Sequence, residues 1–401
     1  MDVFDYLNQY KDTPFRKKRF NEIDALILAL LSYVPYDEIG LGKGKTRGKD
    51  VLKLLDTYYP PRGSSERKLK YIRLLRESLE SERYGSSVFA YFRKERDALN
   101  DKQFQAICIL LNQNLYISFC GTDATTLGWK EDFNMSFLET VPSEVEAAKY
   151  VNFIASKFWF KKIYLLGHSK GGRLAITAAK NLKNKNRLGY IYSFDGPNFP
   201  PSCYEAKYKE IDPRIRSYAP NESIIGRLMP EYRAKKIICS TNSLLLQHDA
   251  FSWLIEDSSF VYASHYTEKS TRIVNTINHT LTTYDDETKM LFVEGLFDIL
   301  DRLDVERLPG EKELLAFFAL RLPFVRREWK NTSKEKRDVI KKIIFACPRH
   351  PLRRPSDPRS SRRNGKRLSG NCGPHCWASF RSGQNAPPAD PPGDPDGADA
   401  P

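Results

Sequence analysis

The fold is decided by the stretch Ile163-Tyr164-Leu165-Leu166-Gly167-His168-Ser169-Lys170-Gly171-Gly172. A short apolar run ends there in Gly-x-Ser-x-Gly, and an alanine-rich segment of helical character, 173–182, follows it. Strand, sharp turn and helix are the setting that holds a serine hydroxyl out at the edge of a sheet. We therefore interpret Ser169 as a nucleophile. The alternative is an ordinary glycine turn with an incidental serine.

Strands and helices alternate around this turn. The β-rich runs predict strands at 87–92, 104–111, 115–120, 188–194, 215–219 and 236–240. The polar residues 112–114 separate two of these runs and are typical of a hairpin. Strands that alternate with helices favour a mainly parallel, doubly wound α/β sheet with helices on both faces.

Four regions follow from the change in pattern along the chain. Residues 1–85 read as a helical N-terminal region packed on the core, 86–284 as the α/β core, and 285–346 as C-terminal helices. The tail, 347–401, is rich in Pro, Gly, Ser and Arg without apolar periodicity, so we expect disorder there. Its Cys372, His375 and Cys376 are too few for a structural zinc site, and we expect neither a metal nor a cofactor.

Composition limits the classes of protein that remain. Of the net charge of +14, the tail contributes +4 and the body +10. We expect solvated helix faces to carry most of this charge, with a weak contact to anionic membranes as the alternative. No nucleic-acid motif is present, no apolar run reaches the length of a membrane span, and the N-terminus lacks a secretory pattern. Seven scattered cysteines suit a reducing compartment, which predicts a cytoplasmic protein.

A serine hydroxyl needs a base to take its proton. In serine hydrolases built on such sheets, the acid and then the histidine follow the serine along the chain. His248 lies in a loop shortly beyond the last expected strand, which is where such a base belongs. His265 is the reserve choice.

The base in turn needs a carboxylate to orient its ring and stabilise its charged form. Glu222 follows the penultimate strand and Asp195 the strand before it. Both lie at carboxyl ends of strands, and position along the chain favours Glu222, with Asp195 as the alternative acid.

Backbone N–H groups must also face the negative oxygen that develops during acyl transfer. Lys170, directly after the nucleophile, is expected to supply one. Thr122, in the glycine turn after the strand 115–120, is expected to supply the other.

These residues carry a resemblance. The segment Phe119-Cys120-Gly121-Thr122, followed by Trp129, Asp132 and the Gly-x-Ser-x-Gly turn, resembles the class 3 (fungal-type) lipases of the α/β-hydrolase superfamily. A bacterial group of lipase-like proteins is more similar still, through four segments: Phe20-Asn21-Glu22-Ile23-Asp24, Trp129-Lys130-Glu131-Asp132-Phe133, Asp195-Gly196-Pro197 and Gln247-His248-Asp249.

The resemblance covers roughly residues 1–345. It implies an α/β-hydrolase fold with Ser169 as nucleophile, His248 as base, and Thr122 and Lys170 in the oxyanion hole. Lipases of this branch usually have an apolar residue where Lys170 stands and an aspartate where Glu222 stands. The segment 129–138 can form a lid in such proteins, although we expect core packing here.

The leading hypothesis is therefore a serine hydrolase of the lipase or esterase type that cleaves a small carboxylic ester or thioester through an acyl-enzyme. The alternative is a catalytically silent protein of the same fold that binds a partner or a membrane surface. Because sites rather than folds carry function, the geometry of the serine, histidine and acid separates the two.

Overall fold

An eight-stranded sheet forms the centre of the computed structural model, which describes residues 1–123, 125–303 and 324–346. The strands are ordered β1-β2-β3-β4-β5-β6-β7-β8. Neighbours from β1 to β4 are antiparallel, and those from β4 to β8 are parallel. The strand bounds are β1 Lys45–Arg47, β2 Val88–Asp97, β3 Lys102–Leu111, β4 Asn114–Phe119, β5 Ile163–His168, β6 Leu188–Phe194, β7 Ile215–Pro220 and β8 Lys236–Ile238, with a separate pair β9 Ile255–Glu256 and β10 Ser259–Phe260.

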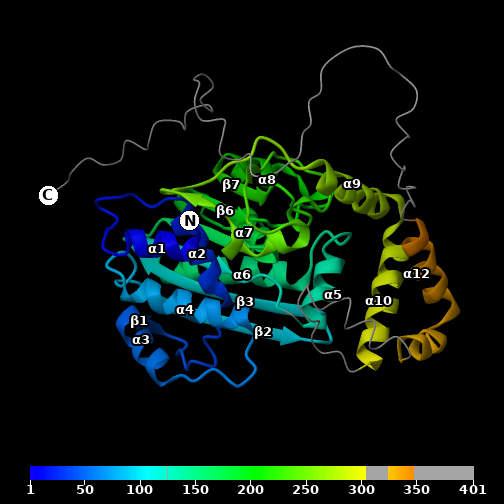
Figure 1. Cartoon of the computed structure of the whole chain (residues 1–401), viewed down its shortest axis with the longest axis horizontal. Coiled ribbons are helices and arrows are strands. Elements are labelled where there is room, and N and C mark those ends of the chain that lie inside the picture. The colour runs from blue at the N-terminus through cyan, green and yellow to red at the C-terminus, as the bar shows by residue number, and fades with distance from the viewer. Residues whose placement is uncertain (124, 304–323, 347–401) are drawn as a thin grey trace, which may run out of the picture. The chain divides into compact units, whose positions relative to one another are not determined.

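Helices lie on both faces of this sheet (Figure 1). The α-helices are α1 Val3–Tyr10, α2 Glu22–Leu30, α3 Gly48–Thr57, α4 Glu66–Glu80, α5 Thr126–Asn134, α6 Pro142–Lys157, α7 Lys170–Asn181, α8 Ala206–Ile211, α9 Glu268–Thr283, α10 Asp286–Arg302 and α12 Lys334–Ala346. The predicted α/β-hydrolase fold with flanking helices is confirmed. The predicted disorder of 347–401, and Cys372, His375 and Cys376 within it, lie outside the described residues.

The alternation of side chains along the strands explains the two layers of helices. On β4, Tyr116 belongs to the core shared with α2, whereas Leu115 and Ile117 belong to the core shared with α6 and α7. On β5, Leu166 and Leu165 divide in the same way. Because successive side chains of a strand point to opposite faces, both faces of the central strands are apolar and both need a cover.

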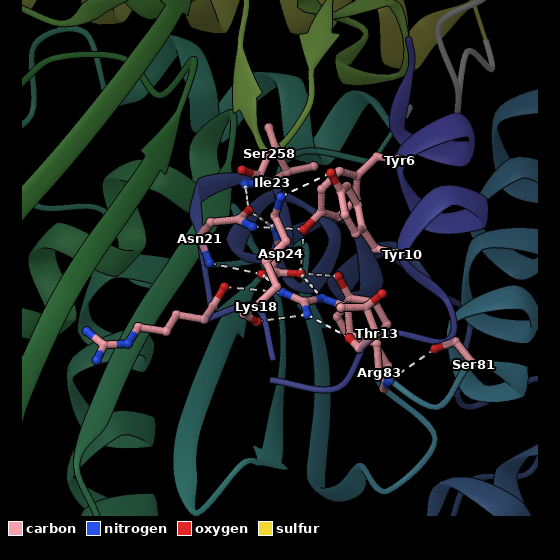
Figure 2. Close-up of polar contacts among 12 residues, drawn as sticks. Tyr6, Tyr10, Thr13, Lys18, Asn21, Ile23, Asp24, Ser81, Arg83 and Ser258 are labelled. Atoms are coloured by element: carbon pink, nitrogen blue, oxygen red, sulfur yellow. Dashed lines mark hydrogen bonds and ion pairs between the residues drawn. The ribbon is translucent and has the colours of Figure 1, made fainter. Parts of the chain in front are cut away.

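A fully buried ion pair fastens the N-terminal region together (Figure 2). The guanidinium of Arg83 donates to both carboxylate oxygens of Asp24, at 2.8 and 2.6 Å. Its remaining donors reach the carbonyls of Thr13, Lys18 and Arg19. The buried charges are thus paired and their hydrogen bonds are satisfied, which is the condition for burying them without a large cost.

The C-terminal helices lie beyond the sheet. In Figure 1, α10 and α12, yellow and orange, run side by side, and α5 contacts α10. Trp129 and Phe137 pack with Val293, Phe297 and Leu300 of α10. Within the described residues, no helix is both long enough and apolar enough to cross a membrane.

Candidate active site

Ser169 occupies the sharp turn between β5 and α7. Its backbone is left-handed, with φ 59° and ψ −135°, which is uncommon for a residue with a side chain. A Cβ at Gly167 would come within 2.1 Å of the backbone of Gly171, and a Cβ at Gly171 would come within 2.1 Å of the carbonyl oxygen of Phe119. Strand and helix can close around the serine only because both positions are glycine.

His248 stands against this serine. It ends the short 3-10 helix Leu244–His248, beyond β8, and its Nε2 lies 2.9 Å from the Oγ of Ser169. Trp253 anchors this loop by donating its indole N–H to the carbonyl of Gln247 at 2.7 Å. The reserve histidine, His265, is exposed and its ring contacts the hydroxyl of Ser264.

Asp195 is the carboxylate that meets the imidazole. Its Oδ2 lies 2.6 Å from Nδ1 of His248, and its Oδ1 accepts a hydrogen bond of 2.6 Å from the hydroxyl of Ser223. Burial alone would raise the pKa of Asp195, but the hydrogen bond and charge of His248 outweigh burial and lower that pKa. Asp195 also has a left-handed backbone, with φ 50°, at the end of β6.

The structure does not bring Glu222, our first choice for the acid, to the imidazole. Its carboxylate accepts hydrogen bonds from the N–H of Leu244 at 2.8 Å and from the hydroxyl of Thr267 at 3.3 Å. The physical reason lies in the strand order: β6, which carries Asp195, is the direct neighbour of β5, whereas β7 is one strand further away. Glu222 instead holds the start of the loop that carries His248.

The loop after β4 passes directly beside the nucleophile. A Cβ at Gly121 would lie 3.0 Å from the Cβ of Ser169, so Thr122 stands at the site. The hydroxyl of Thr122 donates to Oδ2 of Asp132 at 2.5 Å, which leaves its N–H as the group that can face a substrate oxygen. Burial raises the pKa of Asp132 to about 6, and its Oδ1 has no hydrogen-bond partner within the described residues.

The backbone of Lys170 directly follows the nucleophile. As the first residue of α7, it has an N–H that the helix leaves without an intrahelical partner. Its side chain is buried and points elsewhere: Nζ contacts Oε2 of Glu131 at 3.0 Å and donates to the carbonyl and side-chain oxygens of Gln103. Burial alone would lower the pKa of Lys170, but the carboxylate of Glu131 raises it. The lysine is therefore a structural cation that ties the nucleophile turn to α5.

His168 and Tyr33 are two further residues of the site that the sequence did not single out. The Nε2–H of His168 donates to the carbonyl of His248 at 2.9 Å, and the hydroxyl of Tyr33 donates to Nδ1 of His168 at 2.9 Å. Burial lowers the pKa of His168 to about 3, so this ring is neutral and can accept at one nitrogen while donating at the other. In the sequence, the position of His168 next to the nucleophile was the available signal for its place in the site. Its partners, Tyr33 and His248, could not be inferred because they lie far from it along the chain.

The arrangement forms a continuous path of hydrogen bonds from Ser169 through His248 to Asp195. Within the described residues, no group of three or more histidine, cysteine, aspartate or glutamate side chains could hold a metal ion. The fold and this constellation define a lipase-like protein of the α/β-hydrolase class.

The chain belongs to the Mbeg1-like family, whose model matches residues 78–298. It is also similar to solved lipases. The Rhizomucor miehei lipase propeptide complex is 13% identical over 54% of this chain and 67% of the lipase, with a TM-score of 0.34. The lipase from Rhizopus microsporus var. chinensis is 13% identical over 59% of this chain and 86% of the lipase, with a TM-score of 0.35. Among curated proteins, none matches the chain.

Proposed function

We propose that this protein is a serine hydrolase that cleaves a carboxylic ester or thioester of a small molecule through an acyl-enzyme. One observation carries the proposal: a single imidazole lies 2.9 Å from a serine hydroxyl and 2.6 Å from a buried carboxylate. Distances of this size are those required for a base to take a proton from a nucleophile while a third group orients the base.

The proposed reaction has two halves. Ser169 attacks the carbonyl carbon while Nε2 of His248 takes the hydroxyl proton, and Asp195 holds Nδ1–H and stabilises the imidazolium. The N–H groups of Thr122 and Lys170 stabilise the oxyanion. His248 then gives its proton to the leaving alcohol or thiol. A water molecule, activated by the same ring, hydrolyses the acyl-enzyme.

Two features of the chain support a small substrate and a cytoplasmic setting. Ser169 is only 8% exposed, and Trp129 and Phe137, from the segment that could form a lid, pack under α10. The thiols of Cys108, Cys120 and Cys203 are buried and form no disulfide, as expected in a reducing compartment. We therefore propose short acyl esters or thioesters as the substrate class.

Labelling of the purified protein with a fluorophosphonate probe tests the proposal. We expect the wild type to be labelled and Ser169→Ala and His248→Ala to remain unlabelled. Ser202→Ala and His265→Ala are matched controls, because both residues are exposed and neither belongs to the hydrogen-bonded path from Ser169 to Asp195. Circular dichroism must show that each variant is folded. A folded wild type that resists the probe would refute the hydrolase and favour the silent binding protein of the same fold.

A further inference from the structure

A turn at the amino edge of the parallel strands combines positive charge with exposed aromatic rings. From residue 147 to residue 169 the sequence contains four lysines and no Asp or Glu. Near the middle of this acid-free segment, α6 ends and the turn 158–161 leads into β5. The rings of Trp159 and Phe160 at the tip of this turn are 76% and 67% exposed.

Arg187 ties the turn to the end of α6 through hydrogen bonds. This guanidinium donates to the carbonyls of Ala155 and Lys161 at 2.9 Å and also to the carbonyl of Phe158. Phe158 is itself buried, and the ammonium of Lys45 lies 4.6 Å from the centre of its ring. The side chains of Trp159 and Phe160 are therefore exposed to water on a hydrogen-bonded turn, although burying such large apolar groups would be favourable.

Two lysines at this turn lie close to exposed aromatic rings. Lys157 lies 5.3 Å from the ring centre of Phe153, and Lys161 lies 5.2 Å from that of Phe160. The ammonium of Lys161 also donates to the carbonyl of Gln113 at 3.0 Å. In the described part of the chain, these two ammonium groups thus contact rings and a carbonyl rather than carboxylates, and their charge is available to an anionic partner.

We propose that this turn docks the protein on an anionic lipid surface. We name it the docking turn, defined by Lys157, Trp159, Phe160 and Lys161. Tryptophan and other aromatic rings favour the headgroup level of a bilayer, and lysines near the surface are attracted by anionic lipids. The rings project from a turn rather than line a groove. A single-stranded nucleic acid, which also binds aromatic and basic groups, is bound in a groove that follows its backbone.

The topology fixes the orientation that docking would give. Because β4 to β7 are parallel, the docking turn before β5 lies at their amino edge, whereas Ser169 and Asp195 lie at their carboxyl edge. A protein held by the docking turn therefore presents its candidate active site away from the lipid. This inference stands independently of the proposed hydrolase, because no residue of the docking turn belongs to the site.

Sedimentation of the full-length protein with vesicles tests the proposal. Vesicles of phosphatidylcholine with about a third phosphatidylglycerol should bind the wild type, and pure phosphatidylcholine should bind it much less. We expect the variant Lys157→Gln/Lys161→Gln to weaken binding by roughly 25-fold, about fivefold per lysine. Trp159→Ser/Phe160→Ser should weaken it at least tenfold. A rising salt concentration should weaken vesicle binding by the wild type, because salt screens the charges of its lysines.

Two control pairs make the test specific. Tyr59→Ser/Leu99→Ser removes exposed apolar side chains elsewhere, and Lys269→Gln/Lys330→Gln removes exposed charges elsewhere. Neither pair should change binding. Absence of binding to the anionic vesicles, or binding that neither docking-turn pair weakens, would overturn the proposal. Tighter binding to a single-stranded oligonucleotide with the same sensitivity would overturn it in favour of nucleic acid.

Discussion

Replacing Lys170 with methionine tests the interpretation of its side chain as a structural cation. The side chains of Lys170 and Glu131 are 1% and 0% exposed, so Lys170→Met leaves a carboxylate buried without its counter-ion. Removing one partner of a buried pair typically costs about 3–5 kcal/mol. Glu131 keeps the N–H groups of Gln103 and Ser143, and the methionine gains apolar burial, so we expect a net loss of about 2–3 kcal/mol.

Urea unfolding followed by tryptophan fluorescence measures this loss. The midpoint should fall while the dependence on urea stays the same, because the change affects stability rather than the surface exposed on unfolding. The second variant, Lys170→Met/Glu131→Gln, removes the unpaired charge and keeps an acceptor for the N–H of Ser143. It should recover about 2 kcal/mol relative to Lys170→Met. A loss below about 1 kcal/mol in the single variant, or no recovery in the double variant, would refute the reasoning.

Three further predictions concern other carboxylates of the chain. Asp195→Asn should slow fluorophosphonate labelling by roughly 10³–10⁴-fold, whereas Glu222→Gln should slow it less than about tenfold; the reverse order would contradict the assignment of the acid. Asp132 has a folded pKa of about 6, above its unfolded value, so its ionisation costs stability above pH 6 and costs nothing below about pH 4. In urea unfolding, Asp132→Asn should therefore gain about 2 kcal/mol over the wild type at pH 8 and none at pH 4, and an equal difference at both would contradict this. Asp24→Asn leaves a buried arginine unpaired and should cost about 3–5 kcal/mol by urea unfolding, against less than about 1 kcal/mol for Asp50→Asn in an exposed pair.

Patterns that are local in the sequence could be predicted, and contacts between distant segments could not. The strand at 188–194 has the predicted bounds, and the hairpin at 112–114 is present, because alternation and turn chemistry act over a few residues. The short strand β1 has only three residues and no apolar pattern, so nothing in the sequence indicated it.

The candidate site divides in the same way. Ser169 and His248 could be picked out from the turn motif and from position beyond the last strand. The choice between Asp195 and Glu222 depends on which strand neighbours β5, and chain order alone does not give that neighbour. The role of the Lys170 side chain depends on Glu131, which lies 39 residues away along the chain.

The buried pair of Asp24 and Arg83 decides where the polypeptide can be cut. The family match begins at residue 78, so a fragment designed from it would keep the arginine and lose the aspartate. It would also lose α2, which covers the apolar face of β4, β5 and β6. Such a fragment would expose the apolar sheet face to water and leave Arg83 without its counter-ion, and we expect it to aggregate. The smallest polypeptide suited to expression therefore starts upstream of the family signature and includes α2 with Asp24.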